Sequence, residues 1–82
     1  MNQASRTPKQ LGGELRRCRK KRGLTQSQLS SRIAKRQATI STLESAGNGT
    51  LETLFAVLSA LDLELSIRPR TKGGSAQLED IF

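Results

Sequence analysis

Residues 24–44 read LTQSQLSSRIAKRQATISTLE, the pattern of two short helices joined by a tight turn. Thr25 can cap the first helix, and Gln28, three residues later, can return the hydrogen bond that completes a capping box. Leu29 and Ile33 lie four residues apart, so both side chains point to one face of that helix. The stretch therefore predicts two consecutive helices, the first beginning after Thr25.

The second helix of this pair turns a small, polar face to solvent. Ile40 and Leu43 point inward at helical spacing. The outer face is left to four side chains: Gln37, Ala38, Ser41 and Thr42. Such a face suits the major groove of DNA, where an amide can pair with adenine, a methyl can touch thymine and a hydroxyl can bond to several base edges. We predict that these four read bases, with Arg36 reaching a guanine or a phosphate; the alternative is an ordinary solvated face.

The charge of the chain favours a polyanionic partner. The 82 residues carry a net charge of +7, with an isoelectric point of 10.9. Residues 1–40 hold eleven of the 14 Lys and Arg residues and a single acid, Glu14, so the basic surface belongs to the N-terminal half. Within it, the run from Arg16 to Arg22 is open to two interpretations, a solvated helix face or direct phosphate contact.

Helices are also predicted on both sides of the central pair. Thr7 can cap a helix over Pro8 to Arg22, with Gln10 placed to return a capping-box bond. The apolar stripe of this helix is Leu11, Leu15 and Cys18. Thr50 begins a fourth helix with apolar residues at core spacing: Leu51, Leu54, Phe55, Leu58 and Leu61.

The apolar period changes from 3.6 to 2 after the fourth helix. Leu63, Leu65 and Ile67 alternate with polar residues, which predicts a strand. Because a lone strand has no ladder partner in its own chain, we expect it to pair with its copy across a two-fold axis, although an ordinary extended tail is the alternative.

The expected fold class is all-α, a small bundle with one C-terminal strand that pairs across a dimer. The expected parts are a flexible N-terminus (1–6), a DNA-binding domain (7–62), a dimerisation strand (63–70) and a flexible tail (71–82).

The composition argues against catalysis and membrane insertion. The chain has one cysteine, Cys18, and no histidine, and it shows no acid pair or glycine-rich phosphate loop. We therefore expect no catalytic residues, no metal site and no cofactor. No apolar run approaches the roughly 20 residues of a membrane span, and the N-terminus lacks a signal-peptide core. A cytoplasmic protein, nucleoid-associated when bound to DNA, is expected.

Residues 23–45 resemble the helix-turn-helix of the lambda-repressor/Cro family, also called the XRE family. The likeness rests on the Leu24-Thr25-Gln26 opening, on Thr39-Ile40-Ser41 in the recognition helix and on Glu44 near its end. It implies that Gln26 contacts a phosphate and that Arg19 forms a partly buried ion pair with Glu44. The full set of expected phosphate contacts is Thr25, Gln26, Gln28, Lys35 and Thr39.

Two positions depart from that family pattern. Lys35 stands where an apolar residue is common, and Arg36 replaces the usual Ser or Thr cap of the recognition helix. A weak cap is therefore expected. Phosphates can neutralise the cationic pair at the start of this helix.

Within this family, the chain is most similar to the HipB-type antitoxins. The likeness lies in a basic residue followed by residues 37–41, QATIS, and in a short helical body followed directly by a strand. It implies a homodimer joined by a two-stranded ribbon, binding to an inverted-repeat DNA operator, autorepression of its own operon, and a HipA-type serine/threonine kinase toxin as partner. The alternatives are a stand-alone phage- or plasmid-type repressor and, in another class, a protein-interaction module.

Overall fold

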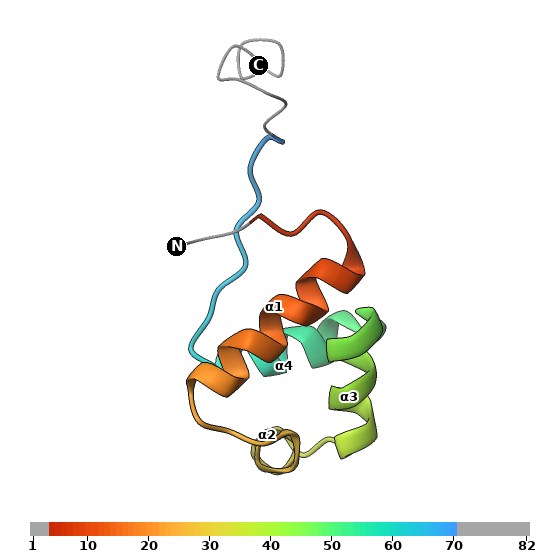
Figure 1. The fold of residues 1–82 in the computed structure, drawn as a ribbon, viewed down its shortest axis with the longest axis vertical. Coiled ribbons are helices and arrows are strands. Elements are labelled where there is room, and N and C mark those ends of the chain that lie inside the picture. Colours follow the sequence, from red (N-terminus) through yellow and green to blue (C-terminus); the bar gives the residue numbers. More distant parts are fainter. Residues whose placement is uncertain (1–3, 71–82) are drawn as a thin grey trace.

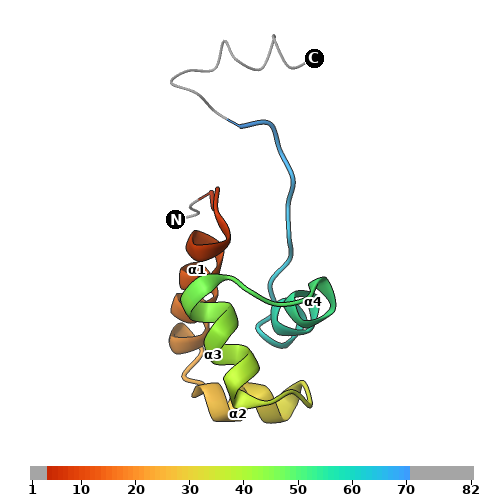
Figure 2. The same ribbon diagram turned by 90° about the vertical axis from the view of Figure 1, so that its right-hand side faces the viewer.

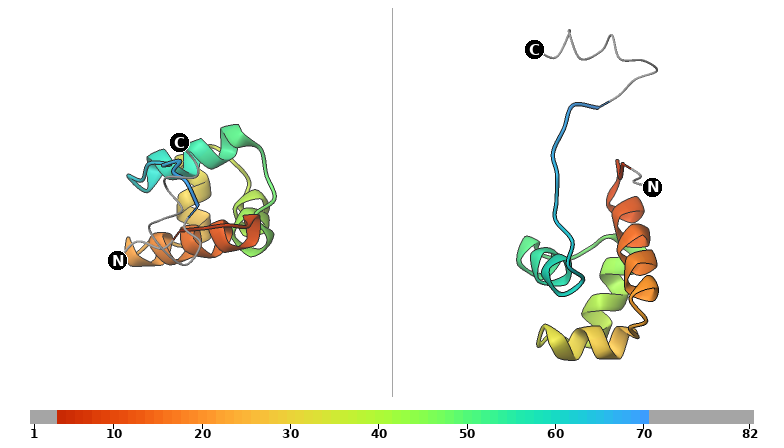
Figure 3. Two further views of the ribbon diagram at one scale, coloured as in Figure 1. Left: turned by 90° about the horizontal axis from the view of Figure 1, so that it is seen from above. Right: turned by 90° about the vertical axis from the view of Figure 1, so that its left-hand side faces the viewer.

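The protein folds as a bundle of helices in the computed structural model, which describes residues 4–70. Over that range the chain forms α1 (Pro8–Lys21), α2 (Gln26–Arg32), α3 (Gln37–Ala46) and α4 (Leu51–Ala60). Figure 1 shows α3 beside α1, with α2 end-on below α1 and beside the lower end of α3. α1 and α4 lie on opposite sides of the body, and α2 crosses beneath them (Figure 3). The expected all-α helix-turn-helix bundle is confirmed. The predicted tail (71–82) and residues 1–3 lie outside the described residues.

Side-chain caps mark where α1 and α2 begin. The Thr25 hydroxyl accepts from the Gln28 backbone N–H at 3.0 Å, and the Gln28 side chain accepts from the Thr25 N–H at 2.9 Å, so the predicted capping box is confirmed. At α1 the expected box is wrong in one half. Thr7 accepts from the Gln10 N–H, but the Gln10 side chain reaches one residue further back and accepts from the Arg6 N–H at 2.7 Å.

All four helices contribute to one apolar core. Its buried members are Leu15, Leu29, Ile40, Leu43, Leu54, Val57, Leu58 and Leu61. The prediction for α4 was wrong at two positions, because Leu51 and Phe55 are 71% and 51% exposed. Leu54, Val57 and Leu58 define the inner face of α4, and Phe55 lies about 100° round the helix from Leu54.

The segment after α4 leaves the helical body as extended backbone (Figure 2). Leu63 packs against the core, whereas Leu65 is 44% and Ile67 is 92% exposed. Within residues 4–70 this segment has no strand partner, so its pairing with a second copy stays a prediction.

None of the helices in the described range, residues 4–70, is long and apolar enough to cross a membrane.

Gly12 allows α1 and α3 to approach closely. A Cβ at this position would collide with the backbone oxygen of Leu43 and lie 2.8 Å from that of Glu44. Both atoms belong to the backbone of α3, so they cannot move aside as a flexible side chain would. The next residue, Gly13, has nothing within 4 Å of the same position. The two adjacent glycines therefore give a matched test of this contact.

We expect Gly12→Ala to destabilise the protein by about 1–3 kcal/mol, because the added methyl overpacks the α1–α3 contact. Gly13→Ala is the control, and we expect it to stabilise the protein by up to about 1 kcal/mol through helix propensity. Urea unfolding followed by circular dichroism measures both. Equal effects of the two substitutions would contradict the close approach at Gly12.

Candidate nucleic-acid interface

The outer face of α3 is exposed in the part of the chain that the structure describes. Gln37, Ala38, Ser41 and Thr42 are all exposed, whereas Ile40 and Leu43 are buried beneath them. The four exposed residues span an arc of about 140° around the helix. They therefore form one continuous outward surface, as the sequence predicted from their spacing.

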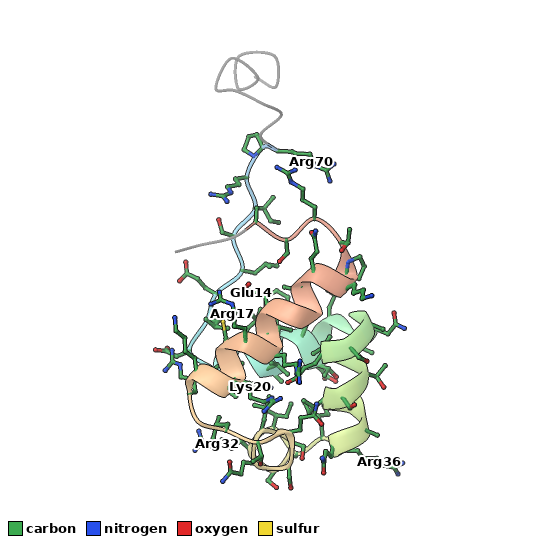
Figure 4. All side chains as sticks on the ribbon, viewed as in Figure 1. Glu14, Arg17, Lys20, Arg32, Arg36 and Arg70 are labelled. Carbon is green, nitrogen blue, oxygen red and sulfur yellow. The ribbon has the colours of Figure 1, made fainter. Side chains whose placement is uncertain are left out.

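Arg36 lies at the start of this surface. Its backbone precedes the first turn of α3, and its side chain makes no capping hydrogen bond, in line with the weak cap expected from the sequence. The side chain points away from the body at one end of the molecule (Figure 4). Among residues 4–70 it has no ion-pair partner within 4.0 Å, so its guanidinium is available to a ligand.

A buried ion pair joins the two ends of the motif. The Arg19 guanidinium donates from Nε to Glu44 Oε2 at 2.7 Å and from Nη2 to Oε1 at 3.0 Å. Both residues are at least 94% buried, with exposed fractions of 6% and 5%. This is the pair that the family resemblance implies. Two parallel hydrogen bonds fix the angle between the partners as well as their distance.

Two further hydrogen bonds complete this network. Arg19 Nη1 donates to the Leu24 carbonyl at 2.6 Å, and Gln26 Nε2 donates to Glu44 Oε1 at 3.1 Å. The network thus ties α1 to the turn before α2, to the first residue of α2 and to the last turn of α3. In the described residues, no buried side-chain nitrogen or oxygen lacks a partner.

The residues expected to bind phosphate have different surroundings. Thr25 and Gln28 are exposed but bond to each other's backbone, and Gln26 is half-buried against Glu44. Lys35 Nζ lies 3.4 Å from Glu52 Oε1 on α4 in an exposed pair, and such pairs contribute little. Thr39 is half-buried in the first turn of α3. These positions surround the start of α2 and α3, and their contacts with phosphate stay predictions.

The structure also shows a basic groove that the sequence did not define. Its lining residues come from α1, α2 and α3: Lys9, Gly13, Arg16, Arg17, Lys20, Gln26, Ser41, Glu44 and Ser45. The basic run of α1 is evident in the sequence, but the part that Lys9 and Ser45 play in the groove was not predicted. Lys9 could have been predicted from its helical spacing, which places it on the same face of α1 as Arg16 and Lys20.

We expect Glu44→Ala to lower the free energy of unfolding by about 3–5 kcal/mol, because it leaves the Arg19 charge buried without a partner. The control is Glu14→Ala, which removes the half-buried carboxylate that pairs with the exposed Arg17 and should cost about 1 kcal/mol or less. Thermal unfolding monitored by circular dichroism compares the two. An unchanged melting temperature for Glu44→Ala would show that the pair does not support the fold.

Comparison with known proteins places the chain in a family. Residues 15–67 match the helix-turn-helix family. Antitoxin HipB of Escherichia coli is 39% identical over 62 residues, which cover 74% of this chain and 70% of that protein. A solved complex of a HipB variant with an O2 20mer gives a TM-score of 0.81 at 33% identity, covering 87% of this chain and 100% of that one. A HipA–HipB–O2–O3 complex gives 0.79 at 35% identity, covering 85% and 100%. The chain therefore belongs to the helix-turn-helix family, among the HipB antitoxins.

Proposed function

We propose that this protein is a sequence-specific DNA-binding repressor, and that it acts as a homodimeric antitoxin regulating its own operon. The observation that carries the proposal is the exposed polar face of α3, held by a buried ion pair and bordered by a basic groove. The relatives support it, because a HipB variant has been solved in complex with an O2 20mer, and HipB has been solved in a HipA–HipB–O2–O3 complex.

The proposed reading of DNA follows from the size and chemistry of α3. A helix with its side chains is about 10–12 Å across and fills a major groove about 12 Å wide. Gln37 then pairs with adenine through its amide, and Ala38 touches a thymine methyl. Ser41 and Thr42 bond to other base edges. Arg36, at the exposed end of the helix, reaches a guanine or a phosphate.

The backbone contacts position this helix in the groove. The start of α2 supplies Thr25, Gln26 and Gln28, and the start of α3 supplies Lys35 and Thr39. Lys35 exchanges its exposed partner Glu52 for a phosphate on binding. These contacts carry no sequence information, but they set the register in which α3 meets the bases.

The dimer in this proposal forms through the extended C-terminal segment. Leu63, Leu65 and Ile67 share one face of that segment, and the last two are exposed in the single chain. Antiparallel pairing across a two-fold axis satisfies the strand edges and covers the exposed side chains. Two copies of α3 then meet an inverted repeat whose half-sites lie about 34 Å apart.

The proposed protein partner is a HipA-type serine/threonine kinase toxin. This part of the proposal rests on the likeness to HipB and on the HipA–HipB complex among the solved relatives. A kinase-like reading frame beside the gene favours the antitoxin, and its absence favours a stand-alone repressor. In either case the proposed activity is binding, without catalysis or a cofactor. The proposed location is the cytoplasm, where the operator DNA lies.

Selection of duplexes from a random pool should yield one inverted-repeat site, and Gln37→Ala should lower discrimination at particular base pairs by about 1–3 kcal/mol. Ser59→Ala, an exposed change on α4, is the control that should leave discrimination unchanged. Competition binding with single-base variants of the selected site measures the effect. Equal wild-type affinity for every duplex would contradict sequence-specific recognition.

We expect Ile67→Asp to weaken the dimer, because it places a charge where an apolar side chain becomes buried between the copies. Ser66→Asp adds the same charge on the other face of the segment and should leave the dimer intact. Sedimentation equilibrium measures both variants. If the wild type is monomeric, or the two variants dissociate alike, the segment is not the dimer interface.

A further inference from the structure

The fold divides the basic run of α1 into groups with different surroundings. Arg19 is buried against Glu44 and takes no part in the surface. Arg17 hydrogen-bonds to Glu14, and this bond together with the Glu14 charge raises the pKa of Arg17. Lys21 and Arg22 are exposed at the end of the helix and do not line the groove. The remaining two cations of the run are Arg16 and Lys20.

Arg16 and Lys20 face α3 across the basic groove. They lie four residues apart, and Lys9 lies seven residues before Arg16, about two turns along the same face of α1. Figure 4 shows Lys20 on the side of α1 that faces α2 and α3. Among the described residues, these three cations have no ion-pair partner within 4.0 Å. Their charge is therefore free to attract an anion into the groove.

The opposite wall of the groove belongs to the recognition helix. Ser41, a predicted base-reading residue, lines it together with Ser45 one turn later. The one acid in the groove, Glu44, is already neutralised by Arg19 and accepts a further bond from Gln26. The basic groove thus runs alongside α3, and none of its lining residues carries an unpaired negative charge.

This placement points to one occupant. A helix that fills the major groove leaves little space between its flanks and the phosphates on the two rims. Side chains that flank α3 therefore meet the sugar–phosphate backbone. We infer that Lys9, Arg16 and Lys20 bind phosphates of one DNA strand beside the bases that α3 reads, an inference that rests on the proposed DNA-binding function.

The arrangement holds DNA differently from a diffuse basic surface. A diffuse surface attracts a duplex in many positions, whereas cations in a groove beside the reading helix hold the strand at one distance from it. The groove thus adds a second set of positioning contacts to those at the starts of α2 and α3. Removal of such contacts weakens binding to all duplexes alike.

Two double variants with the same change in charge test the inference. Arg16→Gln with Lys20→Gln removes two groove cations, and Lys21→Gln with Arg22→Gln removes two cations from the same run outside the groove. Fluorescence anisotropy from 50 to 200 mM salt measures binding to a site selected from a random pool and to a scrambled duplex. Each phosphate contact contributes about −0.9 to the log–log salt slope. The groove variant should therefore have a slope shallower by about 1.8, and the control a nearly unchanged slope.

The outcomes separate this inference from the function on which it rests. Equal slopes for the two double variants, or a wild-type slope for the groove variant, would overturn the phosphate contact. Circular dichroism checks that both variants keep the wild-type fold. Equal wild-type affinity for the selected and scrambled duplexes would count against sequence-specific reading, while the slopes would still test the groove. Absence of wild-type binding to any duplex would overturn both.

Discussion

The ion pair between Arg19 and Glu44 is the constraint on which the orientation of α3 depends. Removing two charges from water costs several kcal/mol for each ion, and this cost is offset only by good geometry and additional hydrogen bonds. The bidentate contact provides the geometry, and the bonds to the Leu24 carbonyl and from Gln26 provide the rest. Separation of α1 from α3 would leave both charges buried and unpaired, and displacement of α2 or of the connection before it would remove one of the supporting hydrogen bonds. Gly12 adds a steric limit, since α1 cannot approach α3 this closely with a larger residue there.

Because the orientation of α3 is fixed, different surfaces of this small protein can have different uses. The inner side of α3 is used by the core, so its outer side is left for recognition, with the basic groove beside it. The extended C-terminal segment runs from the end of α4 to the other end of the molecule: Figure 4 shows Arg36 at one end and Arg70 at the opposite one. A dimer formed through that segment therefore leaves both copies of α3 uncovered. DNA reading and dimerisation, as proposed, use different residues and do not compete.

Local features were predictable from the sequence, and features that depend on packing were not. The capping box of Thr25 and Gln28 and the inward positions of Ile40 and Leu43 follow from spacing within one helix. Phe55 was predicted in the core because the apolar stripe of α4 is wider than the helix face that packs against the other helices. Periodicity alone does not show which edge of that stripe remains exposed to solvent. The groove escaped prediction because Lys9 and Ser45 are brought together only when α1 packs on α3. The partners Arg19 and Glu44, 25 residues apart, came from the family resemblance and not from any local pattern.

The central claim is that α3, held in place by the buried pair, enters the major groove once in each half of a dimer. Hydroxyl-radical footprinting of the wild-type protein on a duplex selected from a random pool tests this most directly. We expect two protected windows on one face of the DNA, related by a two-fold axis and centred about 10–10.5 base pairs apart. A single window, or uniform protection along the duplex, would contradict it.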